Sequence, residues 1–284
     1  VSCQQSLNFT EEELPDFDSS TATGPLMHHV IAELTDLPLD TVVNYYEHSQ
    51  TFFAFARLVS EEVDLIFSME PTADLLEQLE EVRRQINEEA DSIVLETIDL
   101  KWEPIAKEAF VFIANKANPV NNLSIQQIKD IYTGKTNNWK ALGGLDTLIA
   151  PFQRNPDSGS QQIMENLVMN GLDMIEAKAD HSPGGMSLMT HVIAYDNNIN
   201  AIGYNIRYHV LNMDPDPNVK LLSINGVAPT VENIQNGTYP FSGEICVIYR
   251  ANEPRNSKVR KIVRWLSSKE GKAAIEAGNN VPLD

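Results

Sequence analysis

The sequence predicts an α/β protein made of two lobes. With 284 residues, the chain is long enough for two α/β lobes or for one large domain. Apolar runs of strand length alternate along it with segments of helical period, a pattern typical of α/β architecture with parallel sheets. Two places where a strand runs into polar turn residues divide the chain further. Together these features favour two lobes, one of them inserted within the other.

Strands and helices can be placed from local patterns. Ser124 and Gln127 form a capping-box pattern that starts a helix, which Gly134 ends. Ser257 precedes a second apolar stripe at helical spacing. Apolar runs predict strands at residues 63–67, 93–98, 109–114, 201–204, 219–224 and 245–249.

The lobe boundaries follow from the two strand-to-turn junctions. The first junction spans residues 112–118, and the second spans residues 203–217 and ends in an Asp-Pro-Asp-Pro turn. Two crossings imply an inserted lobe, with both chain ends in the outer lobe. The expected division is a tether at 1–14, an outer lobe at 15–114 plus 206–284, and an inserted lobe at 115–205.

The charge balance excludes some partners. The chain has 40 acidic and 21 basic side chains, for a net charge of −19. A field of this sign repels nucleic acid and anionic membranes. It also opposes the approach of an anionic ligand, so an anion site would depend on local donors and dipoles.

The sequences around the two cysteines predict different roles for them. Cys246 lies in an apolar run, where a buried and inert thiol is expected. Cys3, in the sequence Val-Ser-Cys-Gln, looks like the end of a bacterial lipobox, whose cysteine becomes lipidated. An ordinary free cysteine is the alternative. If Cys3 is lipidated, the polar stretch after it is a flexible tether, and the protein is extracytoplasmic and lipid-anchored.

Four polar segments are candidates for a binding site. Segments 18–24, 48–51 and 154–160 each precede a helical pattern, where unpaired N–H groups and the helix dipole favour an anion. Segment 67–71 leaves a strand at its carboxyl end, where ligands bind in open α/β sheets, and it could offer a ligand the Ser68 hydroxyl and the Glu70 carboxylate. Taken singly, each also fits an ordinary helix cap or turn.

A family resemblance connects these segments. Residues 112–119, 123–124, 131–139, 143–144, Arg154 and 158–160, with 201–204, 239–242, 266–271 and 281–283, resemble the phosphate-binding component of bacterial phosphate ABC transporters. The resemblance implies the type II periplasmic-binding-protein fold: two lobes, each a mainly parallel sheet flanked by helices, joined by two crossover strands. Such a protein captures inorganic phosphate or a related oxyanion between its lobes, closes by a hinge motion, and delivers the ligand to an ABC permease.

The resemblance also implies ligand-binding residues. They are Ser20 and Thr21 in the first segment, Ser49 in the second, and Arg154, Ser158, Gly159 and Ser160 in the third. Hydroxyl and backbone N–H groups donate to oxyanion oxygens, and arginine adds charge and a planar fork of donors. These local donors can overcome the unfavourable net charge.

The fourth segment departs from the family pattern. Phosphate-specific members have an aspartate after the serine that corresponds to Ser68, and this carboxylate accepts the proton of monohydrogen phosphate. Met69 takes that place here, with Glu70 one residue further on. Glu70 either turns inward as the acceptor or is a surface carboxylate. Phosphate is therefore favoured, but selectivity over sulfate depends on Glu70.

Other functions have weaker support. The sequence has no motif for a zinc hydrolase, a thiol oxidoreductase, a hydrolase elbow or a dinucleotide site, and its histidines have no metal spacing. We expect a monomeric binding protein without enzymatic activity, cofactor or metal. The alternatives are a sensing or adhesive protein on the same fold and, less favoured, a phosphate-ester hydrolase using Ser158 and His48.

Overall fold

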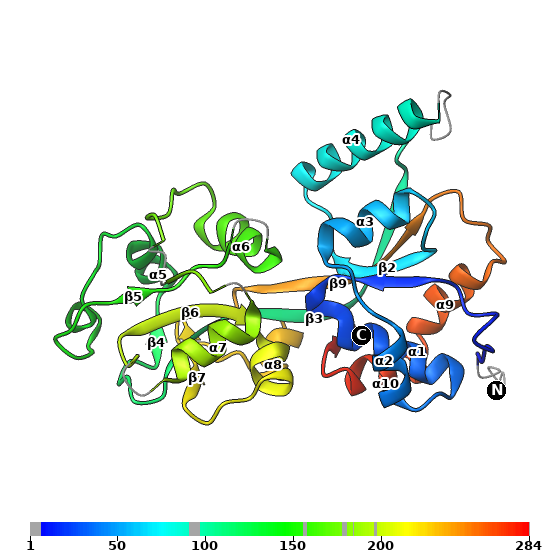
Figure 1. Ribbon diagram of the computed structural model, residues 1–284. Coiled ribbons are helices and arrows are strands. Elements are labelled where there is room, and N and C mark those ends of the chain that lie inside the picture. Colours follow the sequence, from blue (N-terminus) through cyan, green and yellow to red (C-terminus); the bar gives the residue numbers. More distant parts are fainter. Residues whose placement is uncertain are drawn as a thin grey trace. The chain divides into compact units, whose positions relative to one another are not determined.

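The computed structural model describes residues 7–90, 97–155, 158–177, 181–183, 185–195 and 198–283. The chain divides into two compact units (Figure 1). Unit 1 comprises Val1–Lys107 and Glu244–Asp284, and unit 2 comprises Glu108–Gly243. Both chain ends belong to unit 1, so unit 2 is an insertion within it. No described helix combines the length and the apolar character needed to cross a membrane.

Unit 1 contains a mixed sheet. Strand β2 (Leu65–Met69) pairs in parallel with β1 (Phe17–Ser19) and antiparallel with β9 (Ser242–Arg250), while β10 (Val281–Pro282) pairs antiparallel with β3 (Leu100–Asn115). Its helices are α1 (Gly24–Thr35), α2 (Leu39–Tyr45), α3 (Thr51–Val59), α4 (Ala73–Glu89), α9 (Lys258–Leu266) and α10 (Lys269–Ala277), with a 3₁₀ turn, η1, at Thr21–Thr23.

The core of unit 1 explains why its strands read as continuous apolar runs. In β2, Leu65 and Phe67 belong to the cluster that contains α1, α9 and α10, whereas Ile66 belongs to the cluster that contains α3. Side chains alternate between sheet faces, so helices covering both faces require apolar residues throughout. Cys246 of β9 lies in the second cluster and is buried, as predicted, and burial raises the pKa of its thiol to about 12.

Part of the expected tether packs against unit 1. Leu7, Phe9 and Leu14 contact the core cluster of α1, and the Phe9 N–H donates to the Leu34 carbonyl oxygen at 2.8 Å. Residues 7–14 therefore pack against unit 1 instead of forming a solvated tether, because burying their apolar side chains is favourable in free energy. Cys3 lies outside the described residues.

Unit 2 is built around the second half of β3. Strand β6 (Ala201–Ile206) pairs with β3 antiparallel and with β5 (Ala150–Pro151) in parallel, and β7 (Val219–Leu221) pairs with β3 antiparallel. A separate parallel pair joins β4 (Asn122–Leu123) to β8 (Ser223–Ile224). The helices are α5 (Ile125–Tyr132), η2 (Trp139–Leu142), α6 (Gly159–Ile163), η3 (Met164–Met169), α7 (Met186–Ala194), η5 (His209–Met213) and α8 (Val231–Gln235).

The α/β class is confirmed, and three details differ from the sequence prediction. The sheets are mixed, because β9 returns the chain antiparallel to β2 and β3 runs antiparallel to β6. The divisions fall at 107/108 within β3 and 243/244 within β9, not near 114/115 and 205/206. Segment 206–243 belongs to unit 2 because it contains β7 and β8, which pair with β3 and β4.

The predicted capping box is confirmed at the start of α5. The Ser124 hydroxyl accepts from the Gln127 N–H at 3.1 Å, and the Gln127 side-chain oxygen accepts from the Ser124 N–H at 2.7 Å. Gly134 follows the helix with a φ of 77°, a conformation that glycine adopts without a steric cost.

Removing this cap should destabilise the protein measurably. Ser124→Ala leaves the Gln127 N–H without its partner, so we expect a loss of about 1 kcal/mol in the free energy of unfolding. Gln126→Ala, at an exposed position of the same helix, is the control and should change stability by less than about 0.5 kcal/mol in urea denaturation. Equal effects of the two substitutions would contradict the role of the cap.

Candidate functional site

The first and fourth polar segments meet at the carboxyl ends of β1 and β2 in unit 1. The two strands are parallel, and the Ser20 N–H continues their pairing by donating to the Phe67 carbonyl oxygen at 3.0 Å. The Thr23 hydroxyl donates to the same oxygen at 2.6 Å and lies 2.8 Å from the Ser20 hydroxyl. Ser68 is buried in β2, next to Phe67, and Thr21 opens the turn η1. Ser20, Thr21 and Ser68 are thus brought together at one strand edge.

A buried carboxylate ties the second segment to this edge. Asp18 of β1 is 0% exposed and accepts hydrogen bonds from the Ser49 N–H at 2.8 Å and from the Ser49 hydroxyl. Arg57 of α3 donates to Asp18 at 2.7 Å. Asp18 therefore fixes the loop before α3 and neutralises its own charge through an arginine. The sequence placed Asp18 in the first polar segment but carried no sign that it is buried.

The same network changes the expectation for Ser49. Its backbone N–H and its hydroxyl, the two donors that could hold an oxyanion, are both engaged by Asp18. Neither donor is left for a ligand in this arrangement. Direct ligand binding by Ser49 stays a prediction, whereas its contact with Asp18 is observed.

Glu70 and Met69 occupy different surroundings. Glu70 follows the end of β2 and is exposed, and Met69 is half-buried against the core cluster of α1. Of the two alternatives for Glu70, this position favours a surface carboxylate. A thioether cannot accept the proton of a phosphate as a carboxylate does, so these two residues present no buried acceptor.

In unit 2, Arg154 is the central feature of the third segment. It follows β5 and is only 8% exposed. Its backbone N–H donates to the Gln161 side-chain oxygen and to the Tyr204 hydroxyl, both at 3.0 Å. Among the described residues, none forms an ion pair with its guanidinium, and Nε is enclosed without a hydrogen-bond partner. Burial lowers the pKa of Arg154 from its ordinary value, but arginine remains charged in proteins.

The burial of Arg154 without an ion pair among the described residues needs an explanation. Removing a charge from water costs several kcal/mol unless an opposite charge or hydrogen bonds replace the water. An anion at the guanidinium would provide both, through charge-assisted hydrogen bonds to the enclosed nitrogen. The enclosed Nε favours anion binding by Arg154, which stays a prediction.

The serines of the third segment, Ser158 and Ser160, lie where α6 begins, within six residues of Arg154. Ser158 is the N-cap, and its oxygen accepts from the Gln161 N–H at 3.1 Å, which leaves its hydroxyl proton to donate. Gly159 is the first residue of the helix, and Ser160 is buried. Residues 156 and 157 of this segment lie outside the described residues.

Gln161 and Tyr204 hold this loop, and sequence reasoning assigned neither a role. The Tyr204 hydroxyl bonds to the Gln161 side-chain oxygen, so β6, α6 and the Arg154 backbone form one connected network. Burial raises the pKa of Tyr204, so its phenol stays protonated. Tyr204 lies in segment 201–204, one of those that resemble the family, but only the fold shows that it contacts Arg154, fifty positions earlier.

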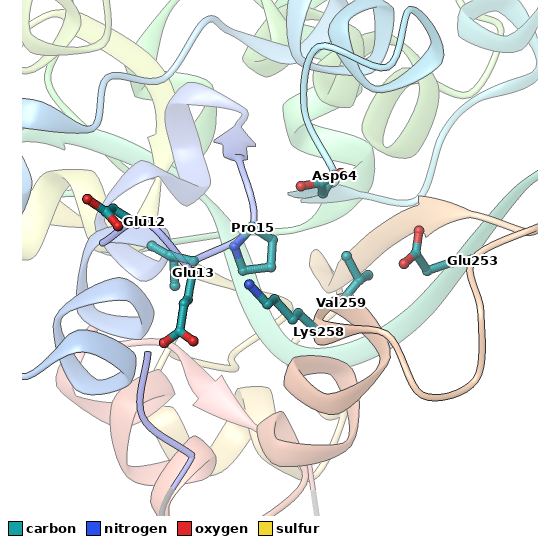
Figure 2. A pocket seen from close by; sticks show the side chains of 8 residues that line it. Glu12, Glu13, Pro15, Asp64, Glu253, Lys258 and Val259 are labelled. Atoms are coloured by element: carbon teal, nitrogen blue, oxygen red, sulfur yellow. The ribbon is translucent and has the colours of Figure 1, made fainter. Parts of the chain in front are cut away.

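A separate pocket in unit 1 does not fit the predicted anion site (Figure 2). It is lined by Glu12, Glu13, Leu14, Pro15, Asp64, Glu253, Lys258 and Val259, and none of the predicted ligand residues is among them. Four of these eight residues are acidic, against one lysine. Such a lining opposes an anion by like-charge repulsion.

The Asp18 network makes a testable prediction. Asp18→Asn removes the charge that Arg57 and Ser49 share, so we expect a loss of about 1–3 kcal/mol in the free energy of unfolding, measured in urea. Glu62→Gln is the matched control, because Glu62 pairs with the same arginine at 3.4 Å but is 61% exposed. That control should cost no more than about 0.5 kcal/mol. If Glu62→Gln lowers the free energy of unfolding as much as Asp18→Asn does, the loss would come from Arg57 and not from the buried carboxylate of Asp18.

The chain is similar to several characterised proteins. It is 28% identical over 267 residues to the phosphate-binding protein PstS of Staphylococcus aureus, covering 92% of this chain and 76% of that one. The structure is similar to a candidate phosphate ABC transporter substrate-binding protein of Clostridium perfringens with bound phosphate (TM-score 0.68, 22% identity, 94% and 98% of the two chains). It is also similar to an ABC-type phosphate transport receptor of Vibrio cholerae (TM-score 0.67, 20% identity, 93% and 98%).

A family model matches most of the chain. The model describes a PBP superfamily domain and covers residues 20–270, which include all of the candidate ligand residues from Ser20 to Ser160. The two-unit α/β architecture, with β3 and β9 as the strands at which the units divide, agrees with this match. This chain belongs to the PBP superfamily, and its fold is that of the type II periplasmic binding proteins.

Proposed function

We propose that this protein is an extracytoplasmic solute-binding protein that captures a small oxyanion, in the first place inorganic phosphate, for an ABC importer. The observation that carries this proposal is the buried Arg154 guanidinium, which has no counter-ion among the described residues. A tetrahedral oxyanion supplies the missing charge and several acceptor oxygens at once.

The donors around Arg154 suit a ligand rich in acceptors. Ser158 retains its hydroxyl proton, and the backbone at Gly159 and Ser160 begins a helix whose first N–H groups lack intrahelical partners. Tyr204 and Gln161 fix the backbone at Arg154, so its donors are held in place before a ligand arrives. This preorganisation supports binding despite a net charge of −19.

The relatives support the choice of ligand. The similar Staphylococcus aureus protein is a phosphate-binding protein, and the similar Clostridium perfringens structure contains phosphate. The same relatives support delivery to an ABC permease outside the cytoplasm. The similar Clostridium perfringens and Vibrio cholerae structures are a substrate-binding protein and a receptor of ABC transport, which favours binding without turnover over the hydrolase alternative.

Three finer points belong to this proposal. We propose that Ser20 and Thr21 also bind the oxyanion, that a lipid at Cys3 holds the protein at the membrane, and that the protein acts as a monomer. Cys3 lies outside the described residues, so the anchor rests on the sequence pattern alone. Labelling with a radioactive fatty acid in cells tests the anchor, because Cys3→Ala should abolish incorporation.

Arg154 provides the direct test of binding. Calorimetry on protein stripped of ligand by partial unfolding should detect phosphate binding without hydrolysis of phosphate esters. Arg154→Ala should weaken this affinity roughly tenfold or more, because a hydrogen bond to a charged group contributes about 1.5–3 kcal/mol.

Lys140→Ala is the matched control for charge. It removes one positive charge from the same unit, at a side chain that is 70% exposed and paired with Asp146. Its phosphate affinity should stay within about twofold of the starting protein, because exposed charges are screened by solvent. Unchanged affinity in Arg154→Ala would remove Arg154 from the site, and turnover of phosphate esters would favour the enzyme alternative.

The exposed position of Glu70 leads to a second prediction. Glu70→Gln should leave the ratio of phosphate to sulfate affinity unchanged, because an exposed carboxylate does not face a bound oxyanion. Competition titration of the two anions measures this ratio. A selective loss of phosphate affinity would show that Glu70 turns toward the ligand.

A further inference from the structure

A buried histidine lies near Arg154 in unit 2. His209 opens η5, three residues after β6 ends, and is only 5% exposed. Its Nε2 lies 3.5 Å from the Ser187 hydroxyl at the start of α7, and its Nδ1 is enclosed without a hydrogen-bond partner among the described residues. An enclosed polar nitrogen without a partner is costly, as it is for Arg154.

Electrostatics connect His209 to Arg154. Burial lowers the pKa of His209, the nearby carboxylate of Asp214 raises it, and the positive charge of Arg154 lowers it. Asp214 also pairs with the more exposed His191, at 3.4 Å. Burial and the arginine together favour a neutral imidazole. Geometry agrees, because β5 and β6 pair in parallel and Arg154 and His209 follow the carboxyl ends of these two strands. Among the described residues, neither Nε of Arg154 nor Nδ1 of His209 has a hydrogen-bond partner.

We propose that His209 is a further ligand-binding residue of the Arg154 site and that its Nδ1 contacts the bound oxyanion. This inference rests on the proposed function and adds a residue that the family resemblance did not supply. One anion next to Arg154 and His209 would satisfy both enclosed nitrogens.

A neutral imidazole adapts to the protonation state of its ligand. When Nδ1 carries the proton, it donates to an oxygen of a fully ionised oxyanion such as sulfate; when Nε2 carries it, Nδ1 accepts the acidic proton of monohydrogen phosphate. Ser187 is compatible with both forms, because a hydroxyl can donate to Nε2 or accept from it. An ionised carboxylate can only accept. His209 thus provides the acceptor that Met69 and the exposed Glu70 do not, without excluding sulfate.

Three substitutions at one position test the proposal. His209→Ala removes both ring nitrogens, His209→Asn places an amide near the position of Nδ1, and His209→Gln places one near the position of Nε2. His191→Ala is the matched control, because it removes a histidine that contacts the same Asp214 while its side chain is 54% exposed. Phosphate and sulfate affinities are measured by calorimetry for each protein, with thermal unfolding as the check of folding.

The expected results separate a ligand contact from a structural role. His209→Ala should weaken binding of both anions roughly tenfold, His209→Asn should retain more affinity than His209→Gln, and His191→Ala should bind as the starting protein does. The starting protein should bind phosphate and sulfate with affinities within about two orders of magnitude of each other, since a tautomeric partner costs neither anion a charged repulsion.

Several outcomes would overturn the inference. Unchanged affinity in a folded His209→Ala protein would remove His209 from the site. Better rescue by His209→Gln than by His209→Asn would assign its role to the Ser187 contact and thus to structure. If the starting protein binds neither anion, the proposed function itself fails, a result that is distinct because it appears before any substitution is made.

Discussion

The proposed site in unit 2 depends on a largely buried arginine, Arg154, for which no ion pair is found among the described residues. Charged side chains are rarely buried unless they are paired. In unit 1 the buried carboxylate of Asp18 pairs with Arg57, whose side chain is 39% exposed. Arg154 is held by its backbone N–H instead, through Gln161 and Tyr204, while its enclosed Nε has no hydrogen-bond partner in the described part of the chain. The contrast between the two arginines is informative. Arg57 fixes a loop through Asp18, whereas no described carboxylate pairs with Arg154, which agrees with anion binding as its predicted role.

The fold brings the relevant groups to strand ends. Ser20 and Ser68 follow or end the parallel pair β1 and β2, and Arg154 follows β5, which is parallel to β6. Ligand groups gather at the carboxyl ends of strands in open α/β sheets because the chain there turns into helix starts with unpaired N–H groups. Each unit thus has candidate donors at its own sheet edge, although the sheets as a whole are mixed.

Local sequence patterns predicted the features of the structure that depend on residues close together in the chain. The capping box at Ser124, the helix start at Ser158 and five of the six predicted strands are short-range patterns, and they are present in the structure. The sixth predicted strand, 93–98, falls mostly outside the described residues, and residues 97–98 are not in a strand. The lobe boundary near residue 205 was misplaced, because the pairing of the three-residue strand β7 with β3 has no local signature. The prediction of a binding site came from the resemblance to a known family and not from local propensity, because each segment alone also fits an ordinary helix cap.

Contacts between distant residues could not be read from the sequence. Asp18 is a binding-loop anchor only because Ser49 and Arg57 fold against it, 31 and 39 positions away. His209 becomes a candidate ligand residue only because burial leaves its Nδ1 without a partner near Arg154. Whether Glu70 faces inward depended on the packing around the end of β2, where the structure shows Glu70 exposed.

A crystal structure of the protein grown with phosphate tests the central claim most directly. The account predicts a phosphate ion with one oxygen within about 3.2 Å of an Arg154 guanidinium nitrogen, and others on the donors at the start of α6. A phosphate bound elsewhere, with Arg154 still lacking an anionic partner, would contradict the account.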